Sequence, residues 1–406
     1  MNVKNAKIPQ YETVAGNMLP VGSTRCGYQI CVQNTTVEEC RAYAQVLEEA
    51  GFTLYAVNEV SAGSEKSYNK NLFYTFTRED VFVFLSWNAS ILTTRIVVEP
   101  PQALPPTVKP RLSNLDIMMP TITQMQLWSG MSYVVQLPDL SFIIVDGGAY
   151  KSEDAKRLYE FLLSNSQKGK KPTIAAWMLT HPHHDHIGLA AEFIRENAAY
   201  IDIKSFAYQF PDNNWMDTSL ESEDEKQGVK RLEKAIADCY SDAVIYTLHT
   251  GQIYYFKGLE IEILCTGDDI FPAIPVTYND VSAAWRMTFD NGKTMMIQGD
   301  CMQRECRQLA HTYGDYLKSD ILQLTHHGLI GGDKKLYQLI DPEICFWAIR
   351  ENRFNGIAAG QKYQWCLGEG GCDYNAWIRN PQIRVRRHYN NSVTTTINVK
   401  EERKHV

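Results

Sequence analysis

The chain has 406 residues, 44% of them hydrophobic, and a formal net charge of −7 at pH 7. This length allows one large core together with a second, smaller domain. The acidic balance argues against stable binding of nucleic acid, since neutralising phosphates requires clustered lysine and arginine.

The beginning of the chain predicts neither export nor membrane insertion. Residues 1–14 have no apolar run behind their lysines, and no stretch of 18 uninterrupted apolar residues follows. The ten cysteines are scattered from Cys26 to Cys372 without a repeating framework, which favours reduced thiols. We therefore expect a cytoplasmic protein with no membrane association.

Residues 1–100 predict a small α+β domain of unknown role. A helix is expected from Thr36, which with Thr35 offers a capping hydroxyl, to Gly51. Strands are expected at 27–33, 53–60, 71–77, 81–87 and 91–98. This domain contains no histidine, so substrate presentation, partner binding or homo-oligomer formation are the roles we expect for it.

Five prolines between positions 100 and 110 interrupt both helix and strand patterns, so we place a linker at 101–112. Residues 113–406 form the second predicted domain, in which strands alternate with helices. Strands are expected at 123–137, 141–145, 173–179, 243–247, 259–264, 284–289, 294–298 and 321–324, and helices at 153–166, 189–197 and 302–317. Two such halves, each a sheet covered by helices, predict an α/β four-layer sandwich.

Metal chemistry is indicated where the apolar strand 173–179 runs into four histidines and an aspartate. Neutral imidazole and carboxylate groups suit zinc and neighbouring first-row metals. His181 and His183 are two positions apart and point the same way in an extended segment, while Asp185 and His186 can turn toward a second metal. The alternative, a surface tract that binds metal adventitiously, is weakened because the whole chain has only ten histidines.

The spacing His-x-His-x-Asp-His after a strand resembles the signature of the metallo-β-lactamase superfamily. Three further segments share the resemblance: Phe142–Gly148, Met295–Asp300 and Ile321–Gly328. It implies an αββα sandwich, with Asp146 orienting metal ligands and Asp300 bridging the metals. The implied cofactors are two divalent metal ions, zinc in the first place, with manganese or iron as alternatives.

Within the superfamily, His326-His327-Gly328 and the Asn279-x-x-Ser282 stretch resemble the soluble hydrolase domain of bacterial DNA-uptake proteins and the phosphorylcholine esterases. The third histidine of the first metal site is absent from its usual place near Tyr278–Asp280. Asn279, Asp280 or water is expected to replace it. His249 lies too early in the chain for that role, and we interpret it as structural.

These resemblances imply attack by a metal-bound hydroxide on a phosphoester within a small or medium anionic substrate. Asp185 is expected to orient the hydroxide and His326 to protonate the leaving oxygen, while His327 binds the second metal beside Asp185 and His186. Neighbours leaving a strand point to opposite sides, so only one of the two adjacent histidines is expected to bind metal, and the reverse assignment remains open.

Two other functions are compatible with this sequence. A hydrolase of lactones, thioesters or β-lactams would share the metal ligands but would ordinarily have the missing third histidine. A degenerate metal-binding sensor, with the first hundred residues binding a partner, is a non-enzymatic alternative, which the otherwise intact ligand set disfavours.

Overall fold

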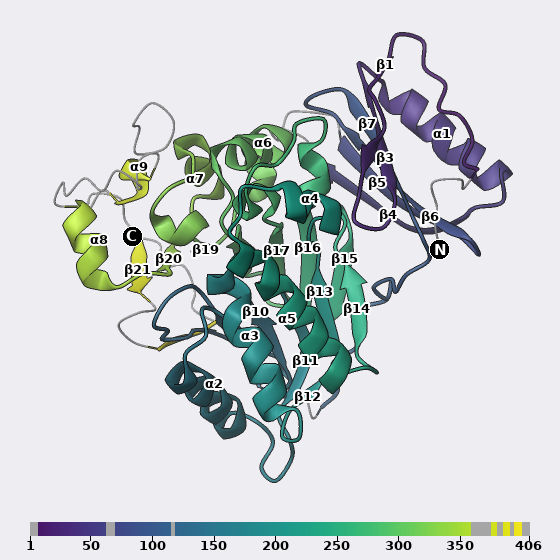
Figure 1. The fold of residues 1–406 in the computed structure, drawn as a ribbon. Coiled ribbons are helices and arrows are strands. Elements are labelled where there is room, and N and C mark those ends of the chain that lie inside the picture. Colours follow the sequence, from purple (N-terminus) through teal and green to yellow (C-terminus); the bar gives the residue numbers. More distant parts are fainter. Residues whose placement is uncertain are drawn as a thin grey trace.

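The computed structural model describes residues 7–61, 70–114, 118–358, 375–379, 385–389 and 394–399. Three sheets organise them (Figure 1). The first is formed by the N-terminal part of the chain, and the other two pack face to face.

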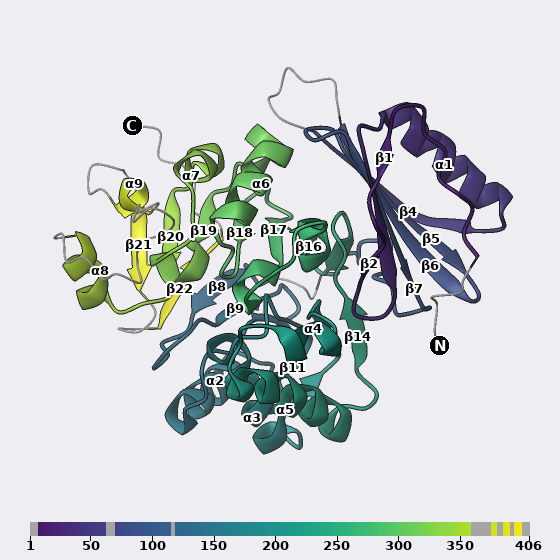
Figure 2. The same ribbon diagram turned by 45° about the horizontal axis from the view of Figure 1, so that its top comes forward.

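Sheet A has seven strands in the order β1-β3-β7-β6-β5-β4, with β2 paired to β3. Their bounds are β1 (Asn17–Met18), β2 (Gly22–Ser23), β3 (Tyr28–Gln33), β4 (Thr53–Ser61), β5 (Lys70–Arg78), β6 (Val81–Asn88) and β7 (Thr93–Glu99). Helix α1 (Val37–Glu49) begins at a capping box of Thr36 and Glu39, in which each side chain binds the other's backbone N–H. It covers one face of sheet A, and the opposite face is turned toward the rest of the protein (Figure 2).

Sheet B has eight strands in the order β14-β13-β11-β10-β9-β8-β22, with β12 paired to β11. Its strands are β8 (Thr121–Gln124), β9 (Tyr133–Gln136), β10 (Phe142–Val145), β11 (Thr173–Met178), β12 (Asp202–Ile203), β13 (Ser205–Tyr208), β14 (Val244–Thr247) and β22 (Thr395–Asn398). Helices α2 (Ser152–Ser164), α3 (His184–Asn197) and α5 (Glu223–Cys239) pack on its outer face, and α4 (Asn213–Thr218) precedes α5. Strands β10, β11, β13 and β14 run parallel, as expected where helices form the crossovers.

Sheet C has seven strands in the order β15-β16-β17-β18-β19-β20-β21. Its strands are β15 (Ile253–Phe256), β16 (Leu259–Cys265), β17 (Ala284–Phe289), β18 (Thr294–Ile297), β19 (Ile321–Gln323), β20 (Ile344–Trp347) and β21 (Arg386–Tyr389). Helices α6 (Gln303–Tyr313) and α7 (Lys334–Ile340) pack on its outer face, and α8 (Glu351–Ala358) and α9 (Ala376–Arg379) follow.

Three hydrophobic clusters fill the spaces between the layers formed by the two larger sheets and their helices. One lies between sheet B and its helices, one between the two sheets, and one between sheet C and its helices. The fold is therefore the predicted four-layer αββα sandwich preceded by a small α+β unit. None of the helices among the described residues is long and apolar enough to cross a membrane.

Several details differ from the sequence-based expectations. The helix expected at 302–317 ends at Tyr313, because Gly314 follows with a φ of +53°. The strand expected at 123–137 is two strands, β8 and β9, because a loop with left-handed backbone at Gly130 separates them. The helix expected from Leu189 begins at His184, so Asp185 and His186 lie in its first turn. Helix α5 was not predicted, although Ser222 caps it and acidic residues fill its first turn.

Candidate metal centre

The predicted metal ligands, and Asp146 that is expected to orient them, follow four strands whose ends meet between the two larger sheets. Asp146 follows β10 and His181 follows β11, and these strands are parallel neighbours in sheet B. Asp300 and the pair His326 and His327 follow β18 and β19, which are parallel neighbours in sheet C. The carboxyl ends of parallel strands lie at one edge of a sheet, so this arrangement collects polar side chains on rigid supports.

Unusual backbone geometry brings these side chains close. Gly299 has a φ of +53°, and a Cβ placed there would lie 2.7 Å from Cβ of Thr180, so only glycine permits sheets B and C to approach here. His326 and His327 have φ values of 47° and 58°, in the left-handed region. The expectation that these two neighbours point to opposite sides is wrong, because it assumed extended backbone. Both rings face Asp300.

Asp146 fixes the orientation of two histidines through hydrogen bonds. It is fully buried, accepts from the Thr180 hydroxyl at 2.7 Å, and contacts Nδ1 of His186 at 2.7 Å. A carboxylate in this role only accepts, so His186 must carry its proton on Nδ1 and leave Nε2 with a free lone pair. Since the Thr180 hydroxyl already donates to Asp146, it accepts from Nδ1 of His181 at 3.1 Å, which frees Nε2 of His181 in the same way.

His183 is oriented from the opposite side of the ring. Its Nε2 lies 3.2 Å from a carboxylate oxygen of Glu221, which accepts the ring proton and leaves Nδ1 as an acceptor. This Nδ1 lies 3.0 Å from Nε2 of His181 and 2.9 Å from Oδ1 of Asn279. With these ring tautomers, Nε2 of His181, Nδ1 of His183 and Oδ1 of Asn279 are three acceptor atoms that face one another. Two ligands at about 2.0–2.1 Å from one tetrahedral zinc ion are separated by about 3.3 Å, so the three atoms suit a shared cation.

A second cluster of potential ligands is formed by Asp185, His186 and His327, whose ligand atoms all lie within 4.8 Å of one another. Nε2 of His327 is 3.2 Å from Oδ2 of Asp185 and 3.3 Å from Oδ2 of Asp300. Asp300 also lies 3.3 Å from Nε2 of His186 and 3.9 Å from Nε2 of His181, so it is placed between the two clusters.

The electrostatics of both clusters favour a cation. Burial holds the pKa of His181 well below its usual value, so its ring is neutral and able to bind a metal. Burial alone would lower the pKa of His327 as well, but the charge on Asp300 and the contact with Asp185 raise it to about 9. Nε2 of His186, Nε2 of His327 and Oδ1 of Asp300 are buried with no hydrogen-bond partner among the described residues. Such unpartnered buried atoms are costly unless a bound ion satisfies them, and the residues therefore fit a pair of metal ions.

His326 is at the edge of this centre and is the most accessible of the ligand-type histidines that face Asp300. Its Nε2 is 3.6 Å from Oδ2 of Asp300, and Nδ1 lies 3.4 Å from the sulfur of Met302. Burial lowers the pKa of His326 to about 4, so at neutral pH the ring is neutral. A neutral ring can donate a hydrogen bond to a substrate oxygen, but it holds no extra proton for a leaving group.

Sequence reasoning missed Glu221 and Thr180, and it left three possibilities for the missing ligand. Among these, Asn279 faces His183, whereas Asp280 accepts hydrogen bonds from the backbone of Val276 and Thr277 within its own turn. Glu221 lies between helices α4 and α5, in a segment with no motif, so no sequence signal marked it. Asn279 could be found only because its position matched a missing histidine.

His249 belongs to neither ligand cluster. It is buried between Glu99 at the end of β7 and Asp268, with Nε2 to Oε2 at 3.3 Å and Nδ1 to Oδ2 at 3.6 Å. It thus joins the N-terminal sheet to the sandwich.

Comparison with known proteins gives one family match and several distant structural likenesses. Residues 125–251 match the family model described as the metallo-beta-lactamase superfamily. The comparison with curated protein sequences gives no match. The metallo-beta-lactamase fold protein YhfI from Bacillus subtilis is 13% identical with a TM-score of 0.37, covering 68% of this chain and 99% of its own. CmlA, a diiron beta-hydroxylase from Streptomyces venezuelae, is 10% identical with a TM-score of 0.38, covering 90% of this chain and 79% of its own. At these scores the structural likenesses carry no argument about function.

Proposed function

We propose that the chain, whose residues 125–251 match the metallo-beta-lactamase superfamily, is a two-metal hydrolase of phosphoesters. A metal-dependent hydrolase is what the fold and the ligand clusters support. The observation that carries the proposal is the convergence of ligand-type atoms from His181, His183 and Asn279, with Asp300 placed between them and a second cluster.

The proposed metal ligands fall into two groups that share one carboxylate. His181, His183 and Asn279 would hold the first ion, Asp185, His186 and His327 would hold the second, and Asp300 would contribute to both. Two ions held there would supply an activated water at neutral pH and positive charge for the phosphoryl oxygens. The amide oxygen of Asn279 is uncharged and a weaker donor than imidazole, so we expect the first ion to be the more easily lost.

The chain's own residues orient the reactants. Asp185 offers carboxylate oxygens to both His186 and His327 from the first turn of α3, where it can also accept a proton from the attacking water. His326 contributes a neutral N–H beside Asp300, suited to a phosphoryl or leaving-group oxygen. A tetrahedral phosphoryl centre has more oxygens to stabilise than an acyl centre, and this additional imidazole favours a phosphoester over a lactone.

The experiment combines metal analysis with a substrate panel. The purified protein should bind up to two equivalents of zinc, manganese or iron, and should hydrolyse phosphomonoesters or phosphodiesters faster than lactones or thioesters. Asn279→Ala should weaken binding of the first ion by tenfold or more and leave binding of the second unchanged, since only one cluster is altered. Asn291→Ala, at an exposed turn between β17 and β18, is the matched control.

Two outcomes would contradict the proposal in different ways. Protein that binds no transition metal, even on titration, would remove the metal centre altogether. Full metal content with turnover of lactones alone would keep the centre and reject the phosphoester substrate.

A further inference from the structure

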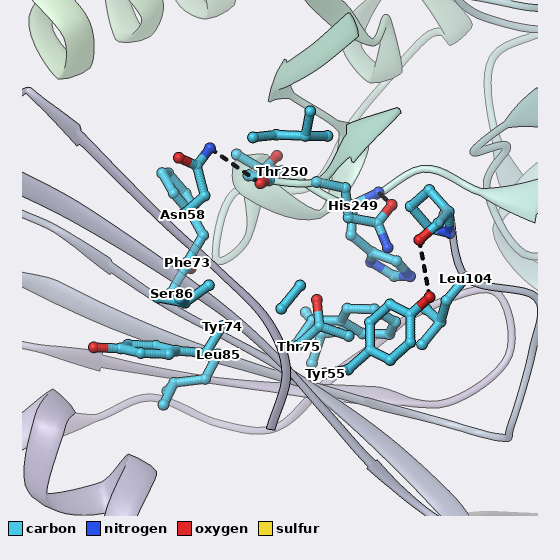
Figure 3. A pocket seen from close by; sticks show the side chains of 18 of the residues that line it. Tyr55, Asn58, Phe73, Tyr74, Thr75, Leu85, Ser86, Leu104, His249 and Thr250 are labelled. Atoms are coloured by element: carbon cyan, nitrogen blue, oxygen red, sulfur yellow. Dashed lines mark hydrogen bonds between the residues drawn. The ribbon is translucent and has the colours of Figure 1, made fainter. Parts of the chain in front are cut away.

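A cavity of about 290 Å³ lies between sheet A and the sandwich, separate from the metal-ligand clusters (Figure 3). Strands β4 to β7 form one wall, and the opposite wall is the turn that carries His249 and Thr250, together with β15. Residues Leu104 and Pro105 of the predicted linker close one side, where the Tyr55 hydroxyl donates to the carbonyl of Pro105 at 3.0 Å.

The wall from sheet A is mainly aromatic and aliphatic. Strand alternation sends one set of side chains toward α1 and the other toward the cavity. Phe73 of β5, Phe84 of β6 and Val97 of β7 are in the second set, as are the small polar side chains of Thr75 and Ser86. Phe84 stacks on the ring of His249 with centroids 3.6 Å apart. A flat ring could extend this stack.

Among the described residues that line the cavity, the two cationic side chains, Arg95 and His249, are both paired. Arg95 donates to Gln29, and to the backbone carbonyls of Asp269 and Phe271 at 3.1 and 2.9 Å. His249 is held between Glu99 and Asp268. Three carboxylates, Glu99, Asp268 and Asp269, therefore face two cations that are already paired. An anionic ligand would meet net negative charge, whereas a neutral or singly positive ligand would not.

One buried polar group at the cavity lacks a partner. The side-chain oxygen Oε1 of Gln252 accepts from the backbone N–H of His249 at 3.0 Å and from the Tyr254 hydroxyl at 2.9 Å, which fixes the orientation of the amide. Its Nε2 has no hydrogen-bond partner among the described residues, and the side chain is buried and lines the cavity. An unpaired buried donor is costly. Nε2 is covered by neighbouring atoms, so a ligand would accept from it only after a small rotation of the side chain.

We propose that this cavity is a small-molecule binding site for a flat heteroaromatic amine, neutral or singly positive. The ring lies among Phe73, Phe84 and Val97, and the amino group faces Asp268 and Asp269. The ligand contacts both sheet A and the sandwich, so its binding stabilises their arrangement. The site does not depend on the proposed hydrolase activity.

Calorimetric titration with a matched pair of probes tests the site. 2-Aminobenzimidazole should bind the metal-loaded protein, and benzimidazole-2-carboxylate, which differs in the charge at one position, should bind at least tenfold more weakly. Ser86→Trp fills the cavity and should weaken the binding of 2-aminobenzimidazole at least tenfold. Thr53→Trp, at an exposed position of β4, should not. His327→Ala should also retain binding, which separates the cavity from the metal centre.

Hydrogen exchange on the wild-type protein gives a second readout that does not depend on the folding of a variant. 2-Aminobenzimidazole should protect the backbone amides of β5 and of residues 248–252. Absence of binding at about 10 mM probe, equal binding of the carboxylate, or binding that survives in folded Ser86→Trp would overturn the proposal.

Discussion

Replacing His249 by glutamine should remove a pH-dependent part of the stability. His249 is buried between Glu99 and Asp268 and stacked on Phe84. Burial alone would lower the pKa of His249, but the charge on Glu99 and the contacts with Asp268 raise it to about 9. Its protonated form therefore fastens the end of β7 in sheet A to the sandwich.

The size of this stabilisation follows from the difference between the pKa of His249 in the unfolded and in the folded state. The pKa rises from about 6.5 in an unfolded chain to about 9, and each unit corresponds to about 1.4 kcal/mol, so about 3 kcal/mol is involved. Because the folded-state value is raised, this stabilisation is complete below about pH 6.5 and is lost as the pH rises through about 9.

The assay is urea unfolding of wild type and His249→Gln between pH 6 and 10, with metal held constant. The difference in unfolding free energy should shrink by about 3 kcal/mol across this range, since the titration of other groups is common to both proteins. His311→Gln, at an exposed position of α6, should leave the pH profile of the wild type unchanged. A difference that stays constant from pH 6 to 10 would refute the reasoning.

Two further predictions concern the metal centre. His327→Ala should lower metal content and activity together. His326→Ala should keep its metals and lose turnover by a factor on the order of 10²–10³, the usual effect of removing one hydrogen-bond donor. Metal loss in His326→Ala with full metal content in His327→Ala would reverse the two roles. Asp146→Asn should weaken metal binding by about 10–100-fold, because an amide that presents its NH₂ to Nδ1 of His186 no longer fixes that ring; unchanged affinity in calorimetry would show that Asp146 does not orient it.

Much of the proposed centre could be predicted because its residues follow strands. A buried apolar strand that ends in a polar residue is visible in sequence, and parallel neighbours bring such ends together, as with Asp146 and His181. The left-handed backbone at His326 and His327 was not visible, because neither residue type requires it and the glycine that marks the turn comes only at Gly328.

Contacts between segments that are remote in sequence could not be predicted either. Glu221 reaches His183 from a segment without periodicity, and Glu99 reaches His249 from another sheet. Nothing local distinguishes either carboxylate from a solvated surface residue. The predicted boundary at residues 101–112 remains a prediction, and the contacts of Glu99 and Arg95 show that the segment before it packs closely on the sandwich.

The proposed ligands come from both halves of the sandwich, with consequences for how the protein assembles. His181, His183, Asp185 and His186 leave sheet B, whereas Asp300 and His327 leave sheet C. An ion bound by both groups is a cross-link between two sheets that are far apart in the chain, and it can form only after they have docked. Metal uptake during refolding would then report the docking of the two halves, and chelation would loosen their shared interface before it unfolded either sheet.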